Sequence, residues 1–199
     1  MRFTTTDLRS TAGFTLLEVL IVGAIVGVLL AMAVLVTPLA VSLARADSGS
    51  SELMAALRTA RERAITERRN MTITFVTPNI VEVRRDDLGV DGLGNIIVTG
   101  TTLVSQTTVS QGMEFRRFDA GVPDTPDGFA PIGDAIEFTG GQPWQFTSEG
   151  TLVSQSGDVV NGTVFMARRD DPLTSRALTI FGATALLRDW SWNGANWVD

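Results

Sequence analysis

The sequence predicts an α+β protein: a long N-terminal hydrophobic α-helix, followed by an antiparallel β-sandwich-like head of the kind that pilin-like proteins carry. Three observations lead to this prediction. Twenty-six consecutive residues between Glu18 and Arg45 lack a formal charge. Apolar residues then recur at helical spacing from residue 53, and beyond residue 70 short alternating segments are separated by Gly, Pro, Asn and Asp.

The N-terminal residues 1–13 are polar, and two arginines with the terminal amine outweigh one aspartate there. The apolar run that begins at Phe14 exceeds the roughly 20 residues that a helix needs to cross a bilayer. Because the basic residues precede the run, we expect the N-terminus to stay in the cytoplasm. Residues 14–44 are therefore predicted to form a membrane-spanning helix.

Two residues distinguish this run from an ordinary anchor: Gly13 stands at its start, and Glu18 lies five residues further on. A carboxylate costs about 2.5–3.5 kcal/mol at the centre of a membrane helix and less near the interface, so it needs a partner. The run offers no cation. Cleavage after Gly13 would supply one, because the new amine of Phe14, or the same amine on a neighbouring subunit, would lie within reach of Glu18.

The nine residues that carry this pattern resemble the N-methylation signal of type IV pilins and type II secretion pseudopilins; they are Gly13-Phe14-Thr15-Leu16-Leu17-Glu18-Val19-Leu20-Ile21. The resemblance implies that a prepilin peptidase cuts after Gly13 and that the new N-terminal Phe14 is methylated. It also implies that Glu18 pairs with the amine of an adjacent subunit during assembly.

The N-terminus allows two other interpretations. Ala44-Arg45-Ala46 before Asp47 has the form of a leader peptidase site, which would make the run a secretory signal peptide. A signal core is roughly 7–15 residues, however, and this run is about twice that length. A plain membrane anchor explains the length of the run but neither Gly13 nor Glu18.

An amphipathic stem helix is predicted over residues 45–70, where Leu53, Leu57, Ala60 and Ala64 recur at intervals of four, three and four. The Gly- and Ser-rich residues 47–51 leave two possibilities, a hinge or a helix start. The stem motif, with Arg61 and the strand-like residues 71–75 after it, is similar to that of GspH/FimT-type minor pseudopilins, and this resemblance favours one long stem. For Arg61 we weigh a solvent-exposed position against a salt bridge that fixes the head to the stem.

The head, residues 71–199, is predicted to be a periplasmic GspH-like domain of short antiparallel strands. Residues 72–75 and 81–84 alternate with period two. Further strands are expected near 96–104, 113–118, 135–139, 151–155, 162–168, 176–181 and 184–192. The match to the GspH head is incomplete, since Ala183 stands where that family has a basic residue.

Composition excludes most catalytic chemistry, because the chain lacks Cys, His and Tyr and all sixteen of its basic residues are Arg. No Ser-His-Asp triad, thiolate nucleophile or Schiff base can be built from the remaining residues. We therefore expect no enzymatic activity and no cofactor. Residues 71–199 carry eight Arg against sixteen acidic residues, a net charge of −8, which disfavours nucleic acid as a partner.

Two candidate surfaces remain in the head. Asp86, Asp87 and Asp91 lie in a Gly-rich stretch that offers oxygen ligands for Ca²⁺, although the spacing is not that of an EF-hand and a solvated hairpin loop is the favoured interpretation. Three tryptophans, at positions 190, 192 and 197, flank Asn193-Gly194, a strong hairpin signal. They offer either an aromatic binding surface or, as favoured here, cross-strand packing.

The sequence thus predicts a minor pseudopilin of a type II secretion system, with residues 1–13 as a cleaved leader. Its expected partners are other pseudopilins or pilins, the prepilin peptidase and secreted proteins. Its expected location is the bacterial inner membrane, crossed once, with the head in the periplasm and later in a periplasmic pseudopilus. The alternative is a FimT-like minor type IV pilin that serves pilus assembly or DNA uptake.

Overall fold

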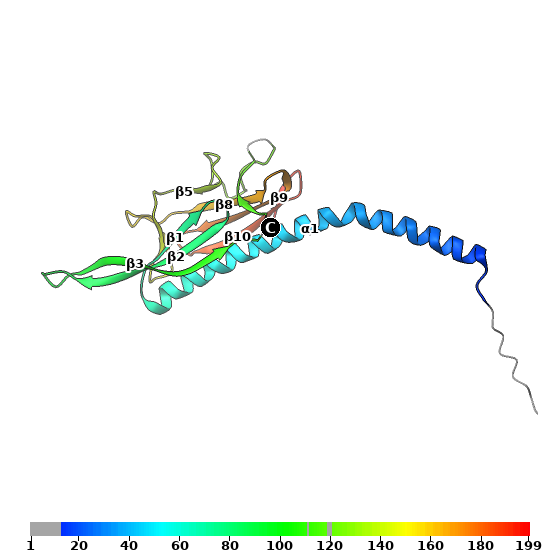
Figure 1. Ribbon diagram of the computed structural model, residues 1–199. Coiled ribbons are helices and arrows are strands. Elements are labelled where there is room, and N and C mark those ends of the chain that lie inside the picture. Colours follow the sequence, from blue (N-terminus) through cyan, green and yellow to red (C-terminus); the bar gives the residue numbers. More distant parts are fainter. Residues whose placement is uncertain (1–12, 111, 119–120) are drawn as a thin grey trace, which may run out of the picture. The chain divides into compact units, whose positions relative to one another are not determined.

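The computed structural model describes residues 13–110, 112–118 and 121–199. The predicted leader therefore lies, except for Gly13, outside the described residues. The chain divides into two compact units, residues 1–41 and 42–199, and helix α1 (Leu16–Glu67) contributes residues to both. Figure 1 shows the strands that follow α1: β1 (Met71–Val76), β2 (Ile80–Val90), β3 (Ile96–Thr108), β4 (Glu114–Phe115), β5 (Ile136–Phe138), β6 (Trp144–Phe146), β7 (Leu152–Val153), β8 (Gly162–Arg168), β9 (Asp171–Phe181), β10 (Leu186–Trp192) and β11 (Trp197–Val198).

The strands of the second unit form two sheets, and all their pairings in the described part of the chain are antiparallel. The first sheet has the order β3-β2-β1-β6-β7. The second has the order β11-β10-β9-β8-β4, and β5 also pairs with β8. The predicted α+β class, a long apolar helix followed by antiparallel sheets, is thereby confirmed.

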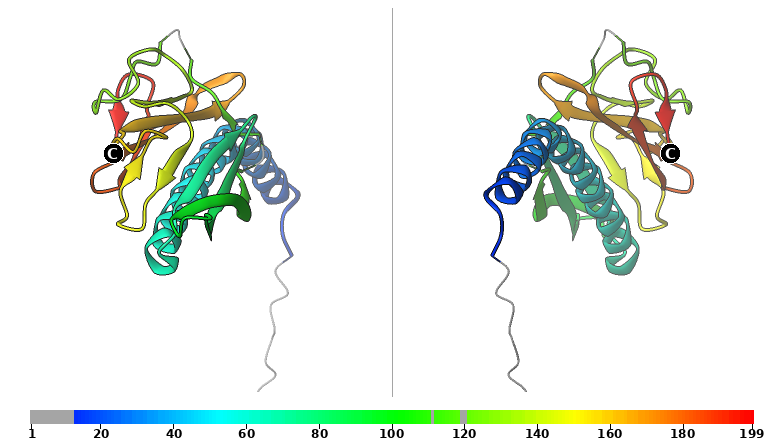
Figure 2. Two further views of the ribbon diagram at one scale, coloured as in Figure 1. Left: turned by 90° about the vertical axis from the view of Figure 1, so that its left-hand side faces the viewer. Right: turned by 90° about the vertical axis from the view of Figure 1, so that its right-hand side faces the viewer.

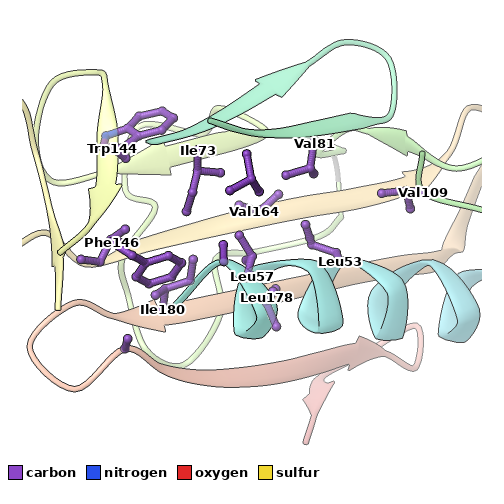
Figure 3. Close-up of a cluster of buried hydrophobic side chains, with 14 of the residues drawn as sticks. Leu53, Leu57, Ile73, Val81, Val109, Trp144, Phe146, Val164, Leu178 and Ile180 are labelled. Atoms are coloured by element: carbon purple, nitrogen blue, oxygen red, sulfur yellow. The ribbon is translucent and has the colours of Figure 1, made fainter. Parts of the chain in front are cut away.

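Residues 42–67 of α1, called the stem below, share one hydrophobic core with both sheets. The side chains of Leu53 and Leu57 are fully buried, as the spacing of apolar residues predicts. They belong to one buried cluster with Ile73 of the first sheet and with Val164 and Leu178 of the second sheet (Figure 3). Each such leucine contributes about 1.5–3 kcal/mol through burial. The stem is therefore an integral part of the globular unit, with strands of both sheets beside it (Figure 2).

The helix continues through residues 47–51, so the structure contains a continuous stem rather than a hinge. The glycine at position 49 allows side chains of the head to pack closely against the helix. A Cβ atom at this position would lie 3.0 Å from Val109 Cγ1 and 3.3 Å from Met113 Cγ. The glycine thus creates a notch in the helix surface, which two residues of the segment before β4 approach. Its helix-weakening effect is offset by this contact with the head.

The stem ends in a left-handed turn at Arg68, whose φ is 51°. The amide of Arg69 donates to the carbonyl of Ala64 at 3.2 Å, the bond expected of a Schellman motif. This turn redirects the chain into β1, which pairs with β2 and β6.

Several strands differ from the expected ones. The segments expected near 113–118 and 151–155 contain only the two-residue strands β4 and β7. Strand β6 was not expected at all, because the three residues Trp144–Phe146 are too short to show a period. These three residues form a strand because they pair with Met71–Ile73 of β1, a contact that the local sequence pattern does not indicate.

Candidate functional site

The junction between Gly13 and helix α1 is the first candidate site, and Thr15 caps the start of the helix there. The Thr15 hydroxyl accepts a hydrogen bond from the Glu18 amide at 3.2 Å, and the Thr15 carbonyl accepts one from the same amide at 3.1 Å. Thr15 is therefore the N-cap and Glu18 occupies the third helical position, which is the residue spacing of a capping box, although only the bond to the Thr15 hydroxyl is formed. Sequence reasoning missed this role of Thr15, although the spacing Thr-x-x-Glu signals it.

The Glu18 carboxylate lies in the first turn of α1 and is exposed. It has no hydrogen-bond or ion-pair partner among residues 13–110, 112–118 and 121–199. Phe14, Glu18, Val19 and Val22 line one shallow hollow on the helix surface. A negative charge at a helix N-terminus is favourable by about 0.3–1 kcal/mol, because it faces the positive end of the helix dipole. The structure thus places Phe14 and Glu18 side by side at the helix start.

The helix that follows this junction presents an apolar surface. Residues Leu16–Ala33 have a mean hydropathy of 2.7 and are long and apolar enough to cross a membrane, and none of these residues is buried within the chain. Leu16 and Leu30, for example, are 83% and 62% exposed. Such a surface is stable only when lipid or other apolar helices surround it.

The predicted acidic loop is not a loop. Strand β2 extends to Val90, so Asp86 and Asp87 point to opposite faces of a strand and only Asp91 lies at the turn. Asp86 is buried and accepts a hydrogen bond from Thr72, whereas Asp87 accepts one from Thr102 at 2.6 Å. The described residues contain no group of three acidic, His or Cys side chains positioned for a metal. The candidate Ca²⁺ ligands are therefore not brought together.

Asp91 instead holds the β2–β3 turn. Its carboxylate accepts hydrogen bonds from the amides of Leu93 and Asn95, both at 2.8 Å, and from the Asn95 side chain at 3.0 Å. The Asn95 side chain in particular, with these amides, lowers the pKa of Asp91. Burial, by contrast, raises the pKa of Asp86.

Because the pKa values of Asp91 and Asp86 shift in opposite directions, removing the charge of each residue should change the stability of the fold in opposite directions. The ionised Asp91 stabilises the fold above its unfolded-state pKa, and this stabilisation is lost as pH falls through its lower folded-state pKa. The ionised Asp86 opposes folding at neutral pH, and that opposition disappears as pH falls through its raised pKa. We expect Asp91→Asn to lower, and Asp86→Asn to raise, the unfolding midpoint in urea at pH 7. Equal and same-signed changes would contradict this account.

The three C-terminal tryptophans pack inside the head. Trp192 and Trp197 face each other across β10 and β11 with ring centroids 5.5 Å apart, and the Trp197 indole donates to the Pro123 carbonyl at 2.9 Å. Trp190 donates to Asp127 at 3.2 Å. All three are buried, so cross-strand packing is correct and these three rings do not form an exposed aromatic surface.

Polar contacts between stem and head form a second, unpredicted group. The guanidinium of Arg176, with its side chain only 6% exposed, binds the carboxylate of Asp47 at 2.7 Å. The Ser50 hydroxyl donates to Asp189 of β10, and Arg168 donates to the hydroxyl of Ser42. We call these three contacts the polar seam. Two of its residues, Asp47 and Ser50, belong to the Gly- and Ser-rich residues 47–51, which the sequence indicated only as a hinge or a helix start.

Arg61 also joins stem to head, but by a hydrogen bond and not by the salt bridge considered from the sequence. Its Nε donates to the carbonyl of Gly150 at 3.0 Å. Gly150 has φ of +81°, and a Cβ there would lie 2.9 Å from Ile65 Cδ1, so the turn approaches the helix closely.

Comparison with known proteins gave one finding of similarity. No protein-family model matches the chain, and no curated protein sequence matches it. The chain is similar to a solved structure, the minor pseudopilin EpsH from the type 2 secretion system of Vibrio cholerae, with a TM-score of 0.42 and 13% sequence identity. That similarity covers 74% of this chain and 97% of EpsH.

Proposed function

We propose that this chain is a membrane-anchored subunit of a pilin-like filament. One observation carries the proposal: an acidic residue without a partner in the described chain stands in the first turn of an exposed apolar helix, directly after a Gly-Phe junction. Such a helix can be held by lipid before assembly and by other apolar helices afterwards. The same helix is thus surrounded by lipid before assembly and lies in the filament core afterwards.

More specifically, we propose that it is a minor pseudopilin of a type II secretion system. In this proposal a prepilin peptidase cuts after Gly13, and the new amine of Phe14 is methylated. Cleavage leaves Phe14 immediately before the N-cap residue Thr15, so the helix begins almost at the mature N-terminus. The Phe14 amine of one subunit then neutralises Glu18 of another.

The fold of the second unit supports anchoring over export as a free protein. A cut at the alternative site would fall between Ala46 and Asp47. Ala46 is fully buried in the core, and Asp47 binds the buried Arg176. Removal of residues 1–46 would therefore take away one core residue and the Ser42 contact of the polar seam, which argues against a signal peptide that ends there.

The proposed subunit has a mechanical role and a single-pass location in the inner membrane, with its head in the periplasm. Its direct partners are other pseudopilins, the prepilin peptidase and, through the head, secreted proteins. Substrate recognition of this kind needs no catalytic group, in keeping with the composition of the chain.

Mass spectrometry of the protein from membranes of cells with and without a prepilin peptidase tests the proposal. We expect a chain that begins with methylated Phe14 when the peptidase is present, and a chain that retains residues 1–13 when it is absent. Gly13→Val should block the conversion, since a β-branched side chain then stands at the cleaved bond. A mature chain that begins at Asp47, or an uncut chain in both strains, would reject the proposal.

A further inference from the structure

The β2–β3 hairpin projects beyond the rest of its sheet (Figure 1). Strand β1 pairs with β2 only as far as Arg85, so residues 86–101, called the arm below, form a two-stranded ribbon. An isolated ribbon of two strands is marginally stable in water, and here the Asp91 turn and the Asp87–Thr102 hydrogen bond hold it. The arm begins beside the end of the stem, where Arg85 forms an ion pair with Glu67 at 3.3 Å.

One face of the arm is apolar and exposed. Leu88 lies opposite Val98 and Val90 lies opposite Ile96, and residues that are opposite each other or two apart on one strand share a face. These four side chains are between 40% and 73% exposed, and Leu93 at the tip is 88% exposed. An apolar face of this kind on a soluble domain marks an interaction surface.

The arm also has a charge of one sign. Its charged residues are Asp86, Asp87 and Asp91, and it contains no arginine. This charge disfavours an anionic membrane surface as the occupant of the apolar face, because lipid headgroups and the arm would repel each other. A suitable partner is apolar and carries arginine.

The same chain provides such a surface. A groove of about 430 Å³ lies between the stem and the β9–β10 turn, lined by Arg58, Arg61, Glu62 and the four residues 184–187. Leu186 in this groove is 54% exposed. Arg58 is exposed and has no hydrogen-bond or ion-pair partner within the described part of the chain. The groove therefore offers an apolar wall beside an unpaired guanidinium.

We propose that the arm of one copy docks into this groove of a second copy, with Leu93 against Leu186 and the acidic turn near Arg58. Arm and groove are different surfaces, so the contact is head-to-tail, and such contacts repeat into open helical assemblies. The inference rests on the proposed filament function and specifies a contact between heads. Each subunit would give its arm to one neighbour and receive an arm from another.

Disulfide cross-linking tests the contact cleanly, because the full chain contains no cysteine. Full-length Leu93→Cys and Leu186→Cys variants are purified separately, mixed in lipid vesicles and mildly oxidised. Both side chains are exposed, so the substitutions leave the core unchanged. We expect the mixture to form about tenfold more covalent dimer than either variant alone, since a disulfide requires Cα atoms within about 7 Å.

The matched control replaces Leu186→Cys with Val159→Cys, an exposed residue (52%) outside the groove. A second readout measures cross-linking of Leu93→Cys to Thr184→Cys in the same groove, which should fall when Leu186→Asp is added to the Thr184→Cys variant. Dimer no more abundant than in the Val159→Cys control would overturn arm docking. The mass measurement on Phe14 is read separately, so a mature methylated terminus without this cross-link rejects the arm contact and leaves the proposed function standing.

Discussion

Glu18→Ala is expected to remove the protein from assembled filaments while its amount in the membrane stays unchanged. The substitution leaves the helix and its apolar surface in place but removes the group that, in the proposed assembly, neutralises the Phe14 amine of a neighbouring subunit. Losing one partner of an ion pair in an apolar environment costs about 3–5 kcal/mol, which corresponds to a reduction in incorporation of about 100-fold or more. Quantifying the protein in sheared filaments and in membranes measures the two amounts.

Thr15→Ala is the matched control for this prediction. It removes the N-cap hydroxyl, which costs about 1 kcal/mol of helix stability, but it keeps the Glu18 carboxylate. Incorporation close to that of the unsubstituted protein is therefore expected. Normal assembly of Glu18→Ala would reject the ion pair, and an equally defective Thr15→Ala would make helix capping the explanation in its place.

Gly182→Ala is expected to destabilise the globular unit by about 3 kcal/mol or more, since the added methyl group has no space and the obstacle is backbone. An ideal Cβ at Gly182 would lie 2.0 Å from the Val160 carbonyl oxygen and 2.9 Å from that of Leu152. The Gly182 amide also donates to the Asn161 side chain, and its carbonyl accepts from the Leu152 amide. Shifting the chain to admit the methyl group would break these bonds.

The four tryptophans all belong to the globular unit, so their fluorescence reports its unfolding by urea in detergent micelles. Gly100→Ala serves as the control, because Gly100 lies in the exposed strand β3 and no atom lies within 4 Å of its ideal Cβ. Its midpoint should stay close to that of the unsubstituted protein. Equal midpoints for the two variants would show that the contacts around Gly182 relax at little cost.

Features with a long repeating pattern were predictable from sequence. The stem residues Leu53, Leu57, Ala60 and Ala64 follow a helical period over three turns, and all four are buried as expected. The apolar run after Phe14 is similarly unambiguous, because its length alone separates it from a buried helix. In both cases many residues follow the same apolar pattern, so a single residue that departs from it does not change the predicted structure.

Features that depend on tertiary contacts were not predictable. Gly49 and Ser50 look like a hinge in sequence, but the head packs into the space that Gly49 leaves and accepts a hydrogen bond from Ser50. Asp86 and Asp87 look like ligands in one loop, but pairing of β2 with β3 makes them strand residues on opposite faces. In each pair, the contact that decides the structure comes from residues outside the local segment in which the pattern stands.

The same limit applies to the candidate sites. The Gly13-Phe14 junction and Glu18 were found because their chemistry is unusual inside an apolar segment. The polar seam was missed because serine, aspartate and arginine are ordinary surface residues, and only the fold brings Asp47 to Arg176.

The notch at Gly49 and the polar seam also determine how force passes through the globular unit. Contacts around the stem, at Ser42, Asp47 and Ser50, engage the head at positions spread over two turns of helix. The head therefore cannot rotate about the stem axis without breaking several of these bonds together. A twist applied to the stem would reach the head as torque, so a filament that turned while it grew would turn its outer surface with it.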